Sequence, residues 1–293
     1  MNGVIVVDKP AGLTSHDVVS RARHIFRERS IGHLGTLDPM ATGLLPLVLG
    51  RMTRLAQFYR AVDKEYEGEI RLGFATATYD AEGEPTREPQ PVNVSLGEIE
   101  AVAVRFCGEI EQVPPPFSAK KVAGVPAYKL ARKQREVKLE PVQVRVYEFG
   151  VGPLIGDRLH FQARVSSGTY VRSMAHDLGN VLGIGAHLAS LRRTAVGEFS
   201  LADAHTLDEL QARAQRGALP EALVHPRRLL PGMPSVTATE ENAAMIRNGR
   251  AVNLPELSRA PLVKVFAGQA ELIAIVSRIA GTLFQPKVVL IGS

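Results

Sequence analysis

The sequence is poor in cysteine and in aromatic residues, and both shortages exclude classes of site. Its 293 residues include one cysteine, Cys107, and no tryptophan. One cysteine excludes an internal disulfide and any zinc site built from several cysteines. Cys107 follows the helix-like apolar run from Ile99 to Phe106, so we expect a buried apolar residue rather than a nucleophile. Aromatic residues make up only 5% of the chain, which leaves few platforms for stacking single-stranded bases.

Long apolar runs are also absent. No run approaches the roughly 18 residues that a membrane-spanning helix needs. The N-terminus lacks a basic stretch followed by an apolar segment, so we expect no signal peptide, no membrane association and a cytoplasmic location. The hydrophobic content of 45% and the charged content of 22% describe an ordinary globular protein. The length suits about two domains.

Positive charge is in modest excess and is unevenly distributed. The net charge is +5 and the sequence pI is about 9.4, which fits either polyanion binding or simple solubility. Between residues 114 and 140, however, seven basic residues are balanced by only two acids. They include Lys120, Lys121, Arg132 and Lys133. This segment is either a phosphate-contacting element or a solvated helix and loop.

The stretch from Gly32 to Gly43, GHLGTLDPMATG, is the most informative part of the chain. It lies between a predicted helix and the apolar run 44–49, and loops between packed elements commonly present chemistry. Pro39 fixes its own φ and biases Asp38 toward an extended conformation. A carboxylate on a stiffened turn, with His33 nearby in sequence, is a reasonable nucleophile or general base. The alternative is a turn in which Asp38 only caps a backbone N–H group.

Apolar periodicity predicts both helices and strands along the chain. Capping patterns begin helices at Thr14, Ser95 and Thr206. Further helices are expected at 52–60, 171–182 and 240–247, and a surface excursion at 75–91. Strands are expected at 4–7, 44–49, 64–74, 142–146, 159–165, 191–197, 262–266, 272–276 and 288–291.

Two further residues stand out from this pattern. Tyr66 lies on the apolar side of the strand 64–74, where it either packs in the core or faces a site. Arg172 lies in the first turn of a predicted helix, a position where the helix dipole disfavours cations. That placement suggests pairing with a carboxylate, although a surface arginine is the simpler reading.

Several motifs together resemble the TruB family of tRNA pseudouridine-55 synthases. The loop 32–43 resembles the family's catalytic signature, and Lys64-x-Tyr66 leading to Leu72-Gly73 resembles its tyrosine motif. The other matching stretches are Asn2-Gly3 with Asp8-Lys9-Pro10, Pro115-Pro116 with Ser118-Ala119-x-Lys121, Ser167–Arg172, Asp177–Gly179 and Leu191–Thr194. The resemblance covers nearly all of residues 1–200.

The resemblance implies an α+β pseudouridine synthase fold with a central antiparallel sheet. The catalytic domain is expected to span residues 1–234, with a basic insertion at about 114–140. Prolines at 220, 226, 231 and 234 mark a linker. Residues 235–293 are expected to form a small, mostly β, PUA-like RNA-binding domain.

The resemblance also implies roles for individual residues, without a cofactor or a metal. Asp38 would be the catalytic carboxylate, acting by covalent attack or by proton removal, and Arg172 would support it. Tyr66 would line the base pocket with Tyr170 and Leu191. It is also a candidate proton acceptor near C5 of the base. His33 would fill the space vacated by the extruded base or contact neighbouring bases. Lys120, Lys121, Arg132 and Lys133 would contact the RNA backbone.

The expected function is isomerisation of uridine 55 in the T-loop of tRNA. The T-arm would be the substrate, and we expect a monomer with no obligate protein partner. Two alternatives share parts of this sequence pattern: a guide-RNA-dependent pseudouridine synthase and a protein that acts mainly as a tRNA-folding chaperone.

Overall fold

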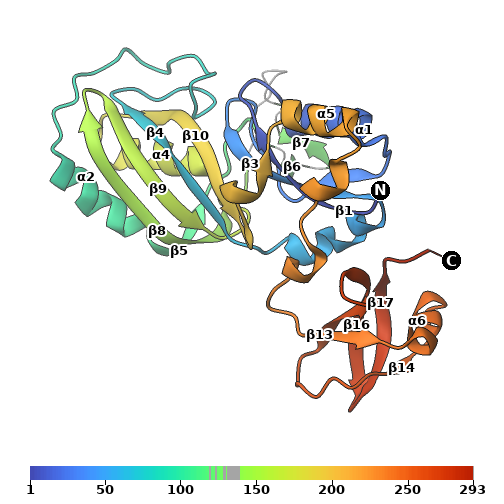
Figure 1. Ribbon diagram of the computed structural model, residues 1–293. Coiled ribbons are helices and arrows are strands. Elements are labelled where there is room, and N and C mark those ends of the chain that lie inside the picture. The colour runs from blue at the N-terminus through green and yellow to red at the C-terminus, as the bar shows by residue number, and fades with distance from the viewer. Residues whose placement is uncertain (119, 123, 128–129, 131–138, 293) are drawn as a thin grey trace.

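Ten of the strands between Gly3 and His205 form one sheet. The computed structural model describes residues 1–118, 120–122, 124–127, 130 and 139–292. The strand order is β12-β1-β3-β10-β4-β9-β8-β5, with β2 paired to β3 and β11 to β10 (Figure 1). The strands are β1 (Gly3–Lys9), β2 (Ile31–His33), β3 (Thr42–Leu49), β4 (Lys64–Leu72), β5 (Gly108–Gln112), β8 (Val142–Ile155), β9 (Arg158–Val165), β10 (Ala186–Val196), β11 (Phe199–Ser200) and β12 (Ala204–His205). Most pairs are antiparallel, while β1–β12 and β3–β10 are parallel.

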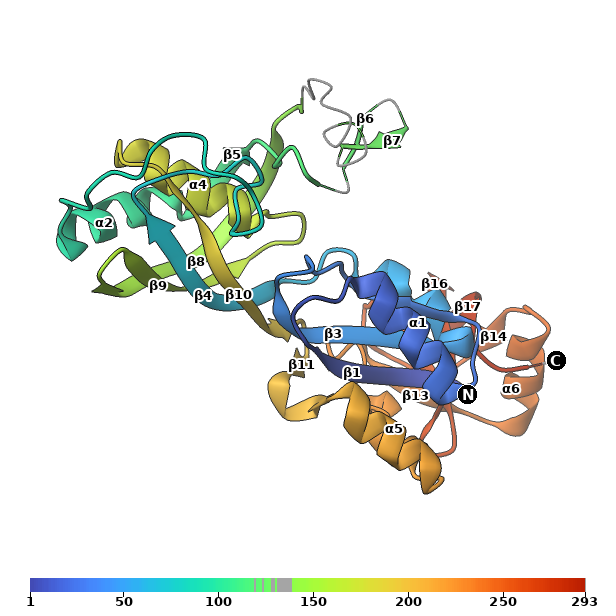
Figure 2. The same ribbon diagram turned by 90° about the horizontal axis from the view of Figure 1, so that it is seen from above.

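Helices pack on this sheet in two groups. In Figure 2, α1 and α5 lie beside β1 and β3, and α2 and α4 lie beside β8 and β10. The helices are α1 (Ser15–Phe26), α2 (Leu96–Ala103), α4 (Val171–Val181) and α5 (Leu207–Gln215), with 3-10 helices η1 (Gly50–Tyr59), η2 (Val104–Phe106), η3 (Leu201–Asp203), η4 (Leu219–Ala222) and η5 (Pro226–Arg228). Capping boxes at Thr14, Ser95 and Thr206 confirm the three predicted helix starts. Residues 52–59 of the predicted helix 52–60 lie in the 3-10 helix η1.

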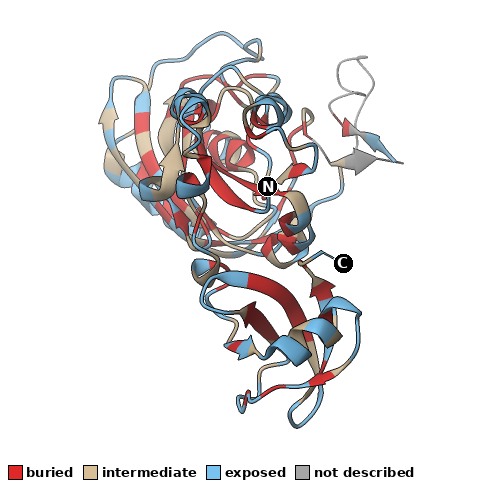
Figure 3. Cartoon of the chain, turned by 45° about the vertical axis from the view of Figure 1, so that its right-hand side comes forward, coloured by how far each residue is buried: buried red, intermediate tan, exposed pale blue. Residues whose placement is uncertain are grey.

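Strand β1 is buried on both faces, because its alternate side chains belong to two different cores. Ile5 and Val7 belong to the core beneath the helices, whereas Val4 and Val6 belong to a second core on the opposite face. A strand buried on both faces reads as a continuous apolar run, as residues 4–7 do. Figure 3 shows this burial along the central strands.

The C-terminal residues form a separate five-stranded sheet in the order β13-β15-β16-β17-β14. Its elements are β13 (Ser235–Ala238), α6 (Glu240–Arg247), β14 (Val252–Asn253), β15 (Leu262–Ala267), β16 (Glu271–Ala280) and β17 (Leu283–Val289). This sheet supplies the other half of the second core. Phe266, Ile275 and Leu290 are buried in the same cluster as Val4 and Leu55, so an apolar contact joins the C-terminal module to the large sheet.

The basic insertion is described in part. A short hairpin of β6 (Lys121–Val122) and β7 (Val125–Pro126) stands apart from the sheet (Figure 2). Lys120 directly precedes it. Arg132 and Lys133 lie outside the described residues. No helix in the described part of the chain is long and apolar enough to cross a membrane.

The α+β prediction is confirmed, and two local predictions are wrong. Cys107 is exposed rather than buried, because α2 and η2 end before it and it begins the turn into β5. The segment 75–91 is not simply a surface excursion, because Thr76 and Asp80 are buried within it. Polar residues suggested a solvated loop, but these two are buried with hydrogen-bond partners.

Candidate active site

A cavity of about 470 Å³ opens beside the loop between β2 and β3. The loop, the end of η1, the start of β4, the N-terminus of α4 and β10 all contribute to its lining. The cavity brings together all six residues predicted for catalysis and base binding. They are His33, Asp38, Tyr66, Tyr170, Arg172 and Leu191. Its volume falls within the range of roughly 300–1,000 Å³ typical of small-ligand sites.

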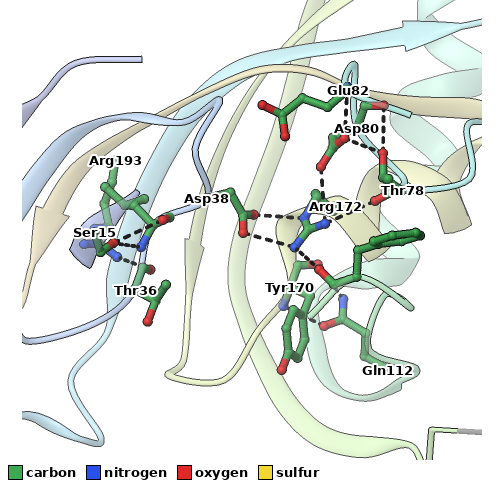
Figure 4. A network of polar contacts seen from close by, with 12 residues as sticks. Ser15, Thr36, Asp38, Thr78, Asp80, Glu82, Gln112, Tyr170, Arg172 and Arg193 are labelled. Carbon is green, nitrogen blue, oxygen red and sulfur yellow. Dashed lines mark hydrogen bonds and ion pairs between the residues drawn. The ribbon is translucent and has the colours of Figure 1, made fainter. Parts of the chain in front are cut away.

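Asp38 and Arg172 form a two-point ion pair (Figure 4). Arg172 Nε lies 2.9 Å from Asp38 Oδ2, and Nη2 lies 3.1 Å from Oδ1. The Arg172 side chain is only 7% exposed, whereas a third of the Asp38 side chain, 33%, remains accessible. The carboxylate is therefore held from the protein side and open on the cavity side. Oδ1 accepts a hydrogen bond from the guanidinium and Oδ2 is in ion-pair contact with it, which is the pattern of an ionised carboxylate.

The remaining donors of Arg172 hold it in place. Nη1 donates to Thr78 O and to Asp80 Oδ2, each at 3.2 Å, and Nη2 donates to Phe117 O at 3.1 Å. The two terminal nitrogens thus make four hydrogen bonds, and Nε faces Asp38 Oδ2 in the ion pair. The buried Asp80 carries a second negative charge on the side of Arg172 away from Asp38 (Figure 4). Arg172 therefore stands between two carboxylates.

Three side chains fix the backbone of the loop that carries Asp38. Arg193, which is 0% exposed, donates to the carbonyl oxygens of Gly35 at 3.0 Å, Thr36 at 3.2 Å and Leu44 at 2.7 Å. Ser15 Oγ accepts from Leu37 N at 2.8 Å and donates to Leu37 O at 3.1 Å. Lys9 Nζ donates to Pro39 O at 3.1 Å.

These contacts come from elements on either side of the loop. Ser15 begins α1, Lys9 ends β1 and Arg193 lies on β10. A loop tied by its main chain on both flanks of Asp38 presents the carboxylate in one position.

Burial changes the charge balance of the site. Desolvation raises the pKa of Asp38 above its usual value, the Arg172 guanidinium opposes that rise, and the Asp80 carboxylate adds to it. Desolvation also lowers the pKa of Lys9 to about 8. The pKa of His33 is lowered by burial and then by Arg193, which favours the neutral imidazole. His33 Nδ1 accepts from Gly35 N at 3.3 Å, which leaves the proton of the neutral ring on Nε2.

The other lining residues supply flat and apolar surface. Tyr66 lies on β4, opposite Arg193 of β10, and is buried except where it meets the cavity. Tyr170 immediately precedes α4. Its N–H donates to Gln112 Oε1 at 2.7 Å, and its carbonyl accepts from Gln112 Nε2 at 3.0 Å (Figure 4). Leu191 completes the apolar wall.

Sequence reasoning missed Asp80, Arg193 and Ser15 as parts of this site. Asp80 lies 92 residues from its partner Arg172, and Arg193 lies 157 residues from Thr36. One signal was available for Arg193. It follows Leu191 at a spacing of two on a strand, so the two side chains share a face, and that face is the cavity side.

No resident metal site was predicted, and the described residues contain no cluster of three or more His, Cys, Asp or Glu side chains that could hold one. The structure places Lys120 before β6 and Lys121 within it. Their contact with RNA, like that of Arg132 and Lys133, stays a prediction.

Known proteins match this chain along most of its length. Residues 23–171 match the TruB family pseudouridylate synthase N-terminal domain, and residues 172–231 match the tRNA pseudouridylate synthase B C-terminal domain. The chain is 49% identical over 293 residues to tRNA pseudouridine synthase B of Solibacter usitatus, covering 99% of this chain and 100% of that protein.

Two solved structures share the fold. They are a Cbf5-Nop10-Gar1 complex, at 27% identity, and an H/ACA RNP bound to a substrate RNA containing 2'-deoxyuridine, at 25% identity. Both match with a TM-score of 0.73 and cover 99% of this chain and 85% of theirs.

Proposed function

The chain belongs to the TruB family and is a tRNA pseudouridine synthase, and from that premise we propose that it isomerises uridine 55 in the T-loop of tRNA. The reaction breaks the bond between uracil N1 and ribose C1′, rotates the base and joins C5 to C1′, after which C5 loses its proton and N1 carries one in the product. Asp38 is the catalytic residue of this proposal. The observation that carries it is the two-point Asp38–Arg172 pair at an open cavity of about 470 Å³.

A uridine within a folded tRNA loop must leave its stack before this carboxylate can reach it. Extrusion costs a few kcal/mol, and the cavity offsets that cost by enclosing the base. Tyr66, Tyr170 and Leu191 give the flipped uracil aromatic and apolar surface. His33, with a lowered pKa and on the same loop as Asp38, occupies the space that the base vacates.

Asp38 acts from its ionised form, by covalent attack or by proton removal. Desolvation weakens that form, and the Arg172 guanidinium stabilises it while fixing its orientation. The accessible part of the Asp38 side chain lines the cavity in which the base would lie. Holding the reacting groups in one geometry supplies much of an enzyme's rate enhancement.

Substitution of Asp38 by Asn tests the proposal. We expect Asp38→Asn to abolish pseudouridine formation, because an amide neither attacks nor accepts a proton effectively. Affinity for tRNA should stay within a few-fold, because it rests on phosphate and shape contacts. The measurement is single-turnover conversion of an unmodified tRNA transcript, read by mass spectrometry after carbodiimide derivatisation of pseudouridine, with filter binding in parallel.

A tRNA transcript with cytidine at position 55 is the matched control for position. Pseudouridine at any other position in the wild-type reaction would contradict the proposed target. Turnover by the Asn variant at about a hundredth of the normal rate or more would contradict the role of Asp38.

A guide-RNA-dependent activity is the second candidate, since one structure that shares the fold is an H/ACA RNP bound to substrate RNA. Against it stand 49% identity and full-length coverage of a relative named tRNA pseudouridine synthase B. Incubating the purified protein with transcript and no other macromolecule separates the two. Conversion without added RNA or protein supports the protein-only form, and conversion only after adding a guide RNA complex supports the alternative.

A further inference from the structure

One hydroxyl group in the cavity is buried without a partner. In the described part of the chain, only Ser118 Oγ and His176 Nδ1 are buried side-chain polar atoms that make no hydrogen bond. Ser118 is 3% exposed and lines the cavity beside Asp38. Buried polar groups in proteins are nearly always paired, so an unpaired one within a ligand cavity points to a partner supplied by the ligand.

Arg172 holds the main chain next to this hydroxyl. Arg172 Nη2 donates to the carbonyl oxygen of Phe117, the residue before Ser118, while the same nitrogen holds Asp38. The Ser118 hydroxyl also lies close enough to the Tyr170 phenol to lower its pKa against the larger rise caused by burial, although the two make no hydrogen bond of normal geometry. Ser118 therefore sits among the groups that surround the reacting base.

A uracil in this cavity brings polar atoms that need partners. Its O2 and O4 accept hydrogen bonds, and among the polar groups that line the cavity the Ser118 hydroxyl is a buried one that no protein group already uses. A serine hydroxyl has one donor to offer. We propose that Ser118 is a substrate-binding residue whose hydroxyl donates a hydrogen bond to an exocyclic oxygen, O2 or O4, of the flipped uracil. This inference rests on the proposed function and assigns a residue to the base's polar edge.

A coupling experiment between enzyme and substrate tests it. Ser118→Ala removes the hydroxyl with little change in volume, and we expect single-turnover conversion to slow by about ten- to a hundredfold. The Kd for tRNA should stay within about threefold, because one contact to one base adds little to binding through many phosphates. Ser20→Ala, which changes an exposed serine of α1 outside the cavity lining, is the matched control and should convert tRNA at the wild-type rate.

The substrates are transcripts that carry uridine, 2-thiouridine or 4-thiouridine at the target position. Sulfur is a poorer acceptor than oxygen, so the wild type should slow on the analogue whose oxygen Ser118 contacts. The Ala variant has no donor to lose there, so its rate should be insensitive to that replacement. Non-additivity of this kind isolates the pairwise interaction from any structural role of Ser118.

Two results would overturn the inference. One is a Ser118→Ala rate within twofold of the wild-type rate. The other is a slowed variant in which both sulfur replacements cost the same factor as in the wild type. If the Ala variant does not fold, the same coupling is measured with Ser118→Cys, whose thiol keeps the volume but donates weakly.

The wild-type reaction distinguishes failure of this inference from failure of the proposed function. No pseudouridine from the wild type on the uridine transcript would contradict the proposed function itself. Normal wild-type turnover with no coupling at Ser118 would contradict only the assignment of this residue.

Discussion

At the scale of single residues, Arg172 has the most demanding position in the molecule. It is almost fully buried, and its guanidinium meets two carboxylates and two main-chain carbonyls. A lysine ammonium offers three donors and no planar fork. The geometry thus requires the guanidinium itself and not only its charge.

Arg172→Lys should therefore lose activity by about a hundredfold or more. At least two charge-assisted hydrogen bonds disappear, each worth roughly 1.5–3 kcal/mol. The Kd for tRNA should change by no more than a few-fold, because Arg172 faces Asp38 and not the solvent. Single-turnover rates check the loss of activity, and filter binding on the same preparation checks the Kd. A variant that binds tRNA tenfold more weakly would show that Arg172 serves the RNA instead.

Asp80 gives the site a pH dependence whose sign follows from its charge. Desolvation and the Asp80 carboxylate both raise the pKa of Asp38, and the ionised form of Asp38 is the active one. Activity should then fall as pH drops through this raised pKa, at a higher pH than an ordinary aspartate would give. Asp80→Asn removes one negative charge, lowers the pKa of Asp38 and moves the acid limb of the kcat profile to lower pH.

The overall rate of Asp80→Asn should also fall by about ten- to a hundredfold, because the amide holds Arg172 less firmly. Glu69→Gln, which removes a negative charge paired with Arg158 outside the cavity, is the control and should leave the limb in place. If the acid limb of the kcat profile of Asp80→Asn stays at the wild-type pH or moves to higher pH, this role of the Asp80 charge is contradicted.

The residues of the site differ in how far the sequence reveals them. Asp38 and Arg172 lie in motifs with glycine and proline at fixed spacing, and the pocket residues follow strand or helix patterns. Asp80 offers no such signal. It lies in a segment of turn-forming polar residues, and only the contact with a helix 92 residues away makes it part of the site. Buried polar contacts between distant segments have no periodicity to detect.

At the scale of elements, the catalytic loop depends on the N-terminus of α1. Thr14 caps this helix, and the next residue, Ser15, makes both hydrogen bonds to Leu37. Neighbouring residues of one turn therefore have separate tasks. Thr14 stabilises the helix, and Ser15 ties the helix to the loop that carries Asp38.

Two substitutions separate these tasks. Ser15→Ala leaves Leu37 N without its partner and should lower the unfolding free energy by about 1–3 kcal/mol, and it should also lower kcat by about tenfold as the loop loosens. Thr14→Ala should cost about 1 kcal/mol of unfolding free energy and leave kcat unchanged. Urea unfolding and single-turnover rates measure both quantities. Equal losses of kcat in the two variants would contradict a specific role for Ser15.

The elements themselves were largely predictable. Capping boxes and periodicity located the helices after Thr14, Ser95 and Thr206 and most of the strands. The extent of β8 was not predictable, because most of residues 150–156, whose composition is typical of a turn, belong to the pair of strands β8 and β9. Glycines there favoured a loop, but pairing with β9 continues the strand to Ile155.

At the scale of the whole molecule, the uneven charge favours contact with a polyanion. We predict that a variant with Lys120, Lys121, Arg132 and Lys133 replaced by Ala binds tRNA more weakly and with a shallower salt dependence. It should lose both tRNA refolding and modification, whereas Asp38→Asn should refold tRNA without modifying it. Refolding and turnover assays across salt concentrations check this. Normal binding and turnover by the charge-removal variant would show that these residues are only a solvated surface.

The second core fixes the position of the C-terminal module relative to the catalytic loop, and this has a consequence for which RNAs can bind. Phe266, Ile275 and Leu290 pack in one cluster with Val4 and Leu55, so the C-terminal module cannot swing on the linker without exposing that surface to water. If the module grips RNA, as proposed for residues 235–293, its distance from Asp38 is a constant of the fold. The protein then selects RNA by a fixed distance. An RNA is accepted when its folded shape spans the distance between the module and Asp38, independently of the identity of its bases.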